Sequence, residues 1–295
     1  VSAISLSAGV NLYGGFTGTE SSLDERSPKT NVTIIDGRYK RRCIIQNYDF
    51  ADSLAIVVDG FTIQNGYLQN NSGVNVKSKK NTTFNNCIFR NSRTGNEGVY
   101  AEKSIFRNCQ FIENKIQDLE IYGGVVDSCS FSDNTTTQSN KIVYLNGSRM
   151  SNSQICGITN EYGIIDAVEN SVISYCKIMN NKIRYYNTVY LSNSTLENSL
   201  VCGNEIYNSG YSYSIISADY TSFITNSTIA HNKTRNSSAV SCNSSSPKKY
   251  TTIANSIIYG NKVTDVVLPQ VVTSDYMKVK YCASDGDLVG ENNIK

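Results

Sequence analysis

One unit of alternating apolar and polar positions recurs along most of the chain. It reads small–x–apolar–x–Asn–[Cys or Ser]–x–[Phe, Ile or Val]–x–x–Asn, and we take the Cys or Ser as the reference position. The reference residues are Phe61 (in a degenerate first copy), Cys87, Cys109, Cys129, Ser153, Cys176, Ser199, Ser227 and Ser256. They are separated by 26, 22, 20, 24, 23, 23, 28 and 29 residues. A short, variable period is typical of a β-solenoid with loops of different length, and the units lack the 3.6-residue periodicity of an α-solenoid.

Two columns of the repeat are apolar in every copy. Three residues before the reference position lie Val58, Phe84, Phe106, Val126, Met150, Ile173, Leu196, Ile224 and Ile253. Two residues after it lie Ile63, Phe89, Phe111, Phe131, Ile155, Ile178, Val201, Ile229 and Ile258. Because side chains alternate along a strand, these columns point inward and residues such as Arg107 and Glu197 point outward. The pattern predicts an all-β, single-stranded, right-handed parallel β-helix of about ten coils and three sheets.

Asparagine forms two further columns, consistent with its abundance of 35 in 295 residues. One column directly precedes the reference position: Asn86, Asn108, Asn152, Asn198, Asn226 and Asn255. The other follows it by five residues: Asn114, Asn134, Asn181, Asn204, Asn232 and Asn261. Asn tolerates left-handed backbone angles, and stacked amides can bond to one another, so both columns are interpreted as structural turn ladders. The alternation of Cys with Ser at the reference position favours buried free thiols over disulfides.

The repeat predicts a single domain over residues 1–295. Residues 1–55 are expected to form the first coils or a cap, 56–261 the regular repeats, and 262–295 a terminal coil that could be truncated. A solenoid end without a cap exposes core and a sheet edge. Lys295 offers no evident cap. Self-association or further chain at that end is therefore one expectation, and folding of residues 262–295 over the end is the other.

Charge and composition exclude several function classes. The net charge is +2 with no basic stripe, so no nucleic-acid partner is expected. No segment approaches the ~20 apolar residues of a membrane-spanning helix, so no membrane span is predicted. The nine cysteines form no C-x-x-C pair, and no metal or cofactor is predicted.

Candidate catalytic residues are sparse. A glycoside hydrolase needs two carboxyl groups about 5–10 Å apart. The strand before each unit supplies Glu102, Glu120, Asp166 and Asp219, which are scattered in sequence and are interpreted as solvated strand residues. His231 is the only histidine and is interpreted as a turn residue. No catalytic residue is predicted.

Four tyrosines occupy similar strands and form the candidate ligand-binding set: Tyr100, Tyr122, Tyr144 and Tyr190. The steps between them are 22, 22 and 46 residues, which leaves one rung vacant near Asp166. An exposed row of this kind could stack on sugar rings or on a protein partner. The alternative, which we favour, is a stabilising stack between rungs.

The chain resembles the right-handed parallel β-helix (pectate-lyase-like) superfamily. Within it, the chain looks most like secreted bacterial β-helix repeat proteins related to polymorphic outer-membrane proteins. Two features carry the resemblance: the Phe-x-x-Asn units Phe111–Asn114 and Phe131–Asn134, and the N-terminal block Gly9–Glu20 followed by Asn31–Gly37. The resemblance implies the fold and a secreted location, whereas the fold hosts lyases, hydrolases and adhesins alike.

Two functions follow as hypotheses. The first is a secreted or cell-surface, non-enzymatic protein with an adhesive, structural or glycan-binding role, whose partner is a polysaccharide or a host or cell-surface protein. The second is a polysaccharide lyase or glycoside hydrolase. Three or more charged side chains converging in one groove would favour the enzyme, whereas exposed tyrosines in a groove without them would favour binding.

Overall fold

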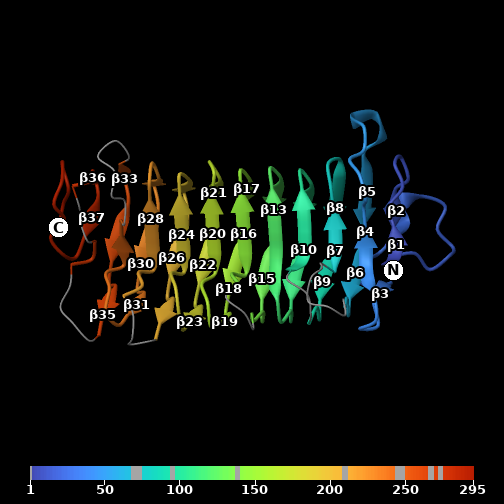
Figure 1. The fold of residues 1–295 in the computed structure, drawn as a ribbon, viewed down its shortest axis with the longest axis horizontal. Coiled ribbons are helices and arrows are strands. Elements are labelled where there is room, and N and C mark those ends of the chain that lie inside the picture. Colours follow the sequence, from blue (N-terminus) through green and yellow to red (C-terminus); the bar gives the residue numbers. More distant parts are fainter. Residues whose placement is uncertain are drawn as a thin grey trace. The chain divides into compact units, whose positions relative to one another are not determined.

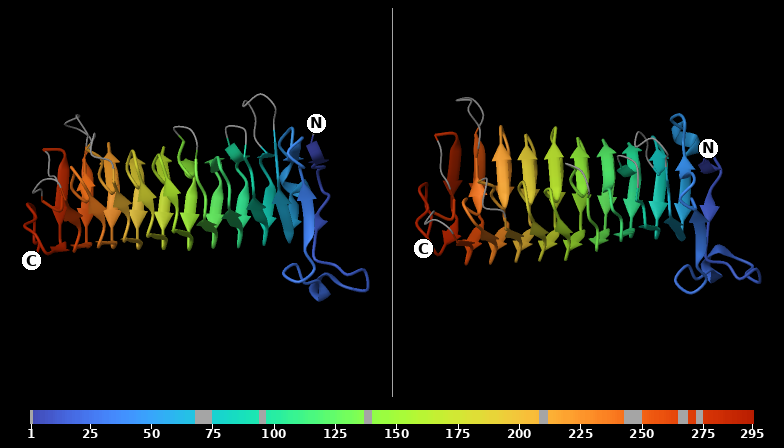
Figure 2. Two further views of the ribbon diagram at one scale, coloured as in Figure 1. Left: turned by 90° about the horizontal axis from the view of Figure 1, so that it is seen from below. Right: turned by 60° about the horizontal axis from the view of Figure 1, so that its bottom comes forward.

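The computed structural model describes residues 2–67, 75–93, 97–136, 140–207, 212–242, 250–264, 269–271 and 275–295. The chain is a parallel β-solenoid of about nine turns, with three sheets and a short fourth one, which confirms the predicted fold class (Figures 1 and 2). It divides into two compact units, Val1–Thr137 and Gln138–Lys295, each described here by itself. The single-domain organisation stays a prediction.

The first unit contributes five strands to each of three parallel sheets, which we call A, B and C. Sheet A contains β1 (Ser2–Ser5), β4 (Arg42–Ile45), β7 (Val76–Ser78), β10 (Glu97–Glu102) and β13 (Gln117–Tyr122). Sheet B contains β2 (Leu12–Tyr13), β5 (Ile56–Asp59), β8 (Thr82–Asn85), β11 (Ile105–Arg107) and β14 (Val125–Asp127). Sheet C contains β3 (Thr33–Asp36), β6 (Phe61–Gln64), β9 (Ile88–Arg90), β12 (Gln110–Ile112) and β15 (Ser130–Ser132). Two short 3₁₀ helices are η1 (Leu23–Glu25) and η2 (Asp52–Leu54).

The second unit continues these three types of sheet and adds a fourth, sheet D. Its sheet A strands are β16 (Val143–Asn146), β20 (Ile165–Val168), β24 (Val189–Ser192), β28 (Ile216–Asp219) and β32 (Val240–Ser241). Sheet B has β17 (Arg149–Ser151), β21 (Val172–Ser174), β25 (Thr195–Glu197), β29 (Phe223–Thr225), β33 (Thr251–Ala254) and β36 (Met277–Lys280). Sheet C has β18 (Gln154–Cys156), β22 (Lys177–Met179), β26 (Leu200–Cys202), β30 (Thr228–Ala230), β34 (Ile257–Tyr259) and β37 (Ala283–Ser284). Sheet D has β19 (Thr159–Asn160), β23 (Lys182–Ile183), β27 (Glu205–Ile206), β31 (Lys233–Thr234) and β35 (Lys262–Val263).

The two predicted apolar columns form the core of both units, since every member of each column is buried. In the first unit the columns contain five phenylalanines, and the rings of successive rungs stack in parallel. The ring centroids are 5.0 Å apart for Phe84 and Phe106 and 4.5 Å apart for Phe111 and Phe131. In the second unit the same positions are aliphatic, as at Met150.

The asparagine column before the reference position forms left-handed turns, as predicted. Its six members have φ between 49° and 51°. Other residues that occupy the same turn with the same backbone include Ser128 with φ 55°, Tyr175 with φ 54° and Tyr281 with φ 55°. Left-handed angles cost most residues energy and cost Asn less, which explains why Asn recurs there.

The second asparagine column is a buried hydrogen-bond ladder, again as predicted. The amide oxygen of Asn204 accepts bonds from the backbone N–H and the side-chain Nδ2 of Asn181, at 3.1 and 2.9 Å. Asn204 Nδ2 in turn donates to the Oδ1 atom of Asn232 at 3.0 Å. Stacked amides therefore satisfy one another and the turn backbone in successive rungs.

The predicted cysteine column consists of free, buried thiols, which confirms the packing interpretation. Cys87, Cys109, Cys129 and Cys176 are all buried and unbridged. Burial raises the pKa of Cys109 well above its usual value, and its neighbours Cys87 and Cys129 add to that effect. The column continues beyond the predicted repeats, because Val279 pairs with Ile253 and places Cys282 at the next reference position.

The segment near the C-terminus adds backbone pairs to the second unit. Lys280 forms a parallel bridge with Glu291, and Ala283 forms one with Ile294. The backbone N–H of Ile294 donates to the carbonyl of Cys282 at 2.9 Å. Residues 291–294 thus lie against β36 and β37.

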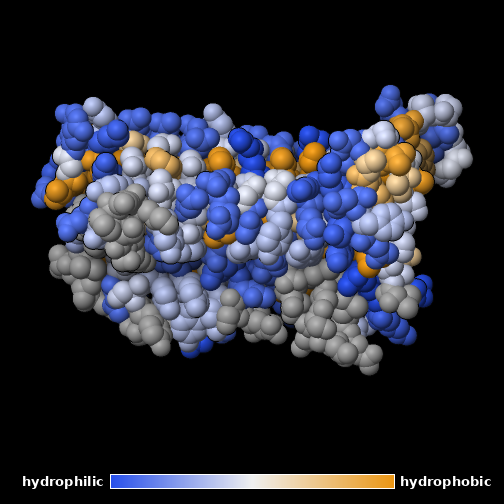
Figure 3. Space-filling view, turned by 45° about the horizontal axis from the view of Figure 1, so that its top comes forward, coloured by the Kyte–Doolittle hydropathy of each residue, from blue (hydrophilic) through white to orange (hydrophobic). Residues whose placement is uncertain are grey.

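Exposed apolar side chains are concentrated in the first coils of the first unit. Figure 3 shows apolar surface gathered on the part of that unit that contains the N-terminus. Its exposed members include Val10, Val32, Ile34 and Leu54.

Candidate functional site

A cavity of about 280 Å³ lies over sheet A of the second unit. It is lined by Lys141, Asp166, Tyr186, Asn187, Tyr190, Ser212, Tyr213, Ser217 and Ser241, and we call it the tyrosine cavity. Asp166, Tyr190, Ser217 and Ser241 occupy matched positions on the successive strands β20, β24, β28 and β32. The remaining residues come from the segments between strands, so the repeat supplies the floor of the cavity and the loops supply its walls.

Lys141 and Asp166 are the charged pair of the cavity. The Lys141 Nζ atom lies 3.9 Å from Asp166 Oδ2, and both side chains are largely withdrawn from water, with 10% and 23% of their surface exposed. The same ammonium lies over the ring of Tyr186, 3.7 Å from its centroid. This cation–π contact holds the lysine against the wall of the cavity.

Burial shifts the titration of this pair in opposite directions. Burial raises the pKa of Asp166 to about 6, and the attraction of Lys141 only partly offsets it. Burial lowers the pKa of Lys141, which Asp166 again partly offsets. The Oδ1 atom of Asp166 is buried and has no hydrogen-bond partner among the described residues, so the carboxylate is poorly satisfied by the protein.

Tyrosine rings form the aromatic side of the cavity. Tyr186 and Tyr213 stack with ring centroids 5.3 Å apart and planes inclined by 23°. Tyr190 donates its hydroxyl to Asp219 Oδ2 at 3.1 Å. Burial, together with the negative charge of Asp219, raises the pKa of Tyr190 to about 12, so its hydroxyl stays protonated and fixed in direction.

The structure brings two of the four predicted tyrosines to this region. Tyr144 on β16 and Tyr190 on β24 occupy the positions on either side of Asp166 in register. Tyr190 lines the tyrosine cavity, and Tyr144 is half-buried beside it. Asp166 therefore occupies the rung at which the spacing of the tyrosines predicted no tyrosine.

The other two predicted tyrosines lie in the first unit, and the strand register there differs from the expected one. Tyr100 pairs with Glu120, whereas Tyr122 pairs with Glu102 two residues further along. Tyr100 and Tyr122 are thus diagonal neighbours, with ring centroids 5.6 Å apart. The expected column with 22-residue steps is wrong here, because β10 and β13 align with an offset of 20 residues.

The acids that the sequence suggested as catalytic candidates have separate partners. Glu120 accepts the hydroxyl of Tyr122 at 2.5 Å. Glu102 accepts a bond from Lys79 at 3.2 Å. His231 lies in a left-handed turn with φ 54°, and its ring packs edge-on against Tyr259. In the part of the chain that the structure describes, no group of three or more His, Cys, Asp or Glu side chains is placed to hold a metal ion.

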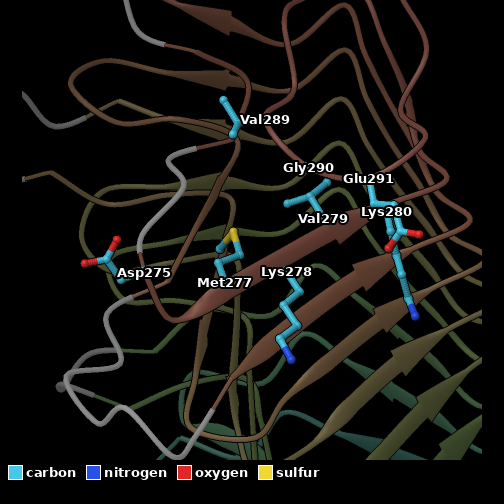
Figure 4. Close-up of a pocket in the computed structure, with 8 residues that line it drawn as sticks. All are labelled: Asp275, Met277, Lys278, Val279, Lys280, Val289, Gly290 and Glu291. Carbon is cyan, nitrogen blue, oxygen red and sulfur yellow. The ribbon is translucent and has the colours of Figure 1, made fainter.

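A second cavity in the second unit, of about 580 Å³, is lined by residues 275, 277–280 and 289–291 (Figure 4). Figure 4 shows that its charged side chains do not meet at one point: Asp275 lies apart from Glu291, which lies beside Lys280, and Lys278 points away from both carboxylates. Met277 and Val279 are buried, which makes the strand side of this cavity a continuation of the core. A third cavity of about 590 Å³ is lined by Glu169, Ser192, Asn193, Tyr220 and Thr221.

Sequence reasoning missed Lys141, Tyr186 and Tyr213, because all three lie outside the repeat unit. The signal was the local excess of tyrosine in two inter-strand segments, Tyr185-Tyr186 and Tyr211-Ser212-Tyr213. Tyr211 lies outside the described residues.

The fold and the cavity define a parallel β-solenoid protein with an aromatic, polar-lined cavity on one sheet. Among solved structures, the tailspike protein of E. coli bacteriophage HK620 in complex with pentasaccharide is similar, with 13% identity, a TM-score of 0.40, and coverage of 100% of this chain and 60% of that one. A mutant of the same tailspike in complex with hexasaccharide has 14% identity and a TM-score of 0.38, with coverage of 97% and 58%. The present chain therefore spans about three fifths of these proteins. No protein-family model and no curated protein matches the chain.

Within the described residues, none of the helices has the length and apolar character needed to cross a membrane.

Proposed function

We propose that this chain binds a glycan, one sugar ring of which occupies the tyrosine cavity. The proposal rests on the lining of this one cavity, which contains three tyrosine rings, a lysine, an aspartate, an asparagine and three serines. A sugar ring presents C–H faces that pack on aromatic rings and hydroxyls that need donors and acceptors. The volume of about 280 Å³ is close to the lower end of the ~300–1,000 Å³ range of ligand sites. It suits one ring of a longer chain.

The charged residues of the cavity favour binding over catalysis. Two charged side chains, Lys141 and Asp166, line it, and Asp219 is engaged with the Tyr190 hydroxyl at its border. This falls short of the three converging charged side chains that would favour an enzyme. The half-buried and exposed tyrosines are instead the feature expected of a binding surface.

The test is a glycan array with the wild-type chain and the variant Tyr213→Ala, followed by titration of the best ligand. We expect Tyr213→Ala to weaken binding about tenfold or more, equivalent to ~1.4 kcal/mol. The matched control is Tyr175→Asn, which removes an exposed tyrosine elsewhere in the same unit and restores the residue that other rungs carry at that turn. Absence of any bound glycan, or equal binding by Tyr213→Ala, would contradict the proposal.

The remaining predicted tyrosines form the wider part of the proposal. Tyr100, Tyr122 and Tyr144 are half-buried and would extend glycan contacts along sheet A of their own units. Tyr122→Ala and Tyr144→Ala should each lower binding of long oligosaccharides on the same array. If both variants bind like wild type, these residues serve only as cross-rung stacks.

Hydrolysis of a glycan is the second candidate function, and one observation favours it. The pKa of about 6 makes Asp166 able to donate a proton near neutral pH, as a general acid must. Incubation with a polysaccharide panel, followed by assays for reducing ends and for unsaturated products, tests it. Turnover that Asp166→Asn abolishes would establish the enzyme and displace the binding role.

The biological setting is also part of the proposal. We infer a secreted or cell-surface protein with an adhesive or structural role, whose partner is a polysaccharide or a host or cell-surface protein. Kinship with the pectate-lyase-like superfamily and with proteins related to polymorphic outer-membrane proteins rests on the sequence motifs Phe111–Asn114 and Gly9–Glu20. Fractionation of the native host followed by antibody detection would test the location.

A further inference from the structure

The Lys141–Asp166 pair is held together without a hydrogen bond. The distance of 3.9 Å between Nζ and Oδ2 exceeds the 2.7–3.2 Å that N–H···O bonds require. Among the described residues, no acceptor lies at hydrogen-bonding distance from the Lys141 ammonium, and no donor lies at that distance from the Asp166 carboxylate. The two groups attract each other, but among the described residues neither has a hydrogen-bond partner in the protein.

The Oδ1 atom of Asp166 is costly to leave in this state, because it is buried and has no hydrogen-bond partner among the described residues. Polar groups withdrawn from water lose free energy when their hydrogen bonds are not replaced. The lysine cannot easily move closer to the carboxylate, because its ammonium is seated over the Tyr186 ring and its stem passes beside Gly163. At Gly163 an added Cβ would lie 3.2 Å from the Lys141 Cδ atom, which shows how closely the stem is packed.

A hydroxyl group is the chemical group that fits between the two charges. Its oxygen can accept a bond from the Lys141 ammonium while its proton is donated to the Asp166 carboxylate. We propose that a hydroxyl of a neutral sugar bridges Lys141 and Asp166, so that the tyrosine cavity selects neutral glycans over glycans whose bound ring carries a carboxylate. This inference rests on the proposed glycan-binding function.

The charges around the cavity explain the selectivity. Lys141 and Asp166 cancel, and Asp219 adds a negative charge at the border through the hydroxyl of Tyr190. A sugar ring that carries a carboxylate would gain Lys141 as a partner, but its negative charge would be repelled by Asp166 and Asp219. The carboxylate also has no proton to donate to Asp166, whereas a hydroxyl has one. A neutral ring keeps the pair balanced and satisfies both members.

The pH of the experiment provides an independent readout. The groups on the elements packed around Asp166 are Lys141 and Tyr144 on one side, and Tyr190 with Asp219 on the other. Because the pKa of Asp166 is about 6, the carboxyl is mostly ionised at pH 7.5 and mostly protonated at pH 5. Protonation removes the negative member of the pair, so discrimination against acidic rings should shrink at pH 5.

The experiment uses matched oligosaccharide pairs that differ only in a hydroxymethyl or a carboxylate at C6: glucose and glucuronic acid, galactose and galacturonic acid, mannose and mannuronic acid. The full chain is measured at pH 7.5 and pH 5. We expect the neutral member of the bound pair to bind at least tenfold more tightly at pH 7.5, and the ratio to fall to about threefold or less at pH 5. Equal or tighter binding of the acidic member at pH 7.5, or a ratio that does not change with pH, would overturn the inference.

Two variants test the bridge itself. Lys141→Met and Asp166→Asn should each weaken binding of the neutral sugar about tenfold, and Asp166→Asn should also reduce the preference for it. Tyr175→Asn is the control for both, and melting temperatures verify that each variant is folded. Unchanged neutral binding in folded Lys141→Met would show that no bridge forms.

The outcomes separate this inference from the proposed function. If wild type binds no glycan, or if Tyr213→Ala leaves binding intact, glycan binding at the tyrosine cavity is itself wrong. If wild type binds and Tyr213→Ala does not, but acidic and neutral rings bind equally, glycan binding stands and the bridge is wrong.

Discussion

The two units follow the same repeat but stabilise it by different chemistry. In the first unit the core columns carry stacked phenylalanines, and the reference position carries Cys87, Cys109 and Cys129. In the second unit the core is aliphatic, and serine occupies most reference positions, with cysteine at Cys176 and Cys282. Ser199 Oγ accepts the backbone N–H of Cys176 at 3.0 Å and donates to the carbonyl of Glu197 at 2.7 Å.

The difference shows that the solenoid constrains the shape of each position more than its chemistry. A thiol and a hydroxyl fill the same buried slot, one by packing and the other by hydrogen bonds. Aromatic and aliphatic side chains likewise fill the same core positions. Among the described residues, sheet D belongs to the second unit, and so does the tyrosine cavity.

The largest effect is expected from truncating the aromatic stack. Phe111 lies between Phe89 and Phe131, with ring centroids at 4.8 and 4.5 Å. Phe111→Ala should lower the free energy of unfolding by about 3–5 kcal/mol, because it leaves a cavity between two rings that cannot close. Urea denaturation followed by circular dichroism measures the loss, with Phe111→Leu as the milder control. A loss of less than ~1 kcal/mol would mean that the stack is not a major source of stability.

The amide ladder predicts the next effect. Asn204 makes four bonds to buried partners, namely those to Asn181 N and Nδ2, Ile178 O and Asn232 Oδ1. Asn204→Ala should cost about 3 kcal/mol, since several buried groups lose their partners together. Asn134 in the first unit makes two such bonds, to Asn114 N and Phe111 O, so Asn134→Ala should cost about half as much. Equal losses in the same denaturation experiment would remove this distinction between the units.

Asp166 predicts a smaller, pH-dependent effect in the second unit. Its native pKa of about 6 lies above the usual value of 3.8, because the carboxyl is buried. Between pH 3.8 and 6 the native state therefore binds more protons than the unfolded state does. The contribution of Asp166 to stability is present below pH 3.8 and is lost as the pH rises through 6. Relative to Asp166→Asn, wild type should lose about 1 kcal/mol between pH 4 and pH 7.5, a figure reduced for the partial exposure of the side chain and for the Lys141 charge.

Asp36 in the first unit provides the opposite case. Burial tends to raise its pKa, but bonds from the Arg38 backbone N–H, Gln64 and Asn65 outweigh burial and lower it. Its contribution is therefore present at neutral pH and is lost on acidification. Urea titrations at several pH values should show Asp36→Asn and Asp166→Asn deviating from wild type in opposite directions. The same direction for both would contradict the assigned causes.

The core and the turns could be predicted from the sequence because each rung repeats one environment. The columns through Phe106 and Phe111 are apolar in every copy, and the left-handed turn recurs at Asn108, so a single pattern determined many residues. The short strands of sheet D had a weaker signal. In strands such as Lys182–Ile183 and Glu205–Ile206, a polar residue and then an apolar one come directly after an asparagine of the second column. Two-residue strands are too short for periodicity to detect.

The candidate site could be predicted only in part. Tyr190 lies on a repeat strand and was identified from its spacing, whereas Lys141 and Tyr186 lie in segments of variable length. The interpretation of Asp166 as a solvated strand residue was wrong, because its side chain is only 23% exposed. Loop length also determines register, which is why the position of Tyr122 was wrong by two residues. The raised pKa of Asp166 depends on burial by these loops, and no local pattern encodes it.

The smallest effect concerns the turn that both units share. Tyr175 adopts φ 54° and is 62% exposed, so it has a strained backbone and little packing in return. Tyr175→Asn should raise the free energy of unfolding by a few tenths of a kcal/mol, or ~1 °C in melting temperature, because Asn tolerates this conformation better. Ser128→Asn in the first unit should give a gain of the same size, since its φ is 55°. The reverse change Asn198→Tyr should destabilise, and calorimetry that finds no gain in the first two variants would show that asparagine recurs there for its side-chain bonds instead.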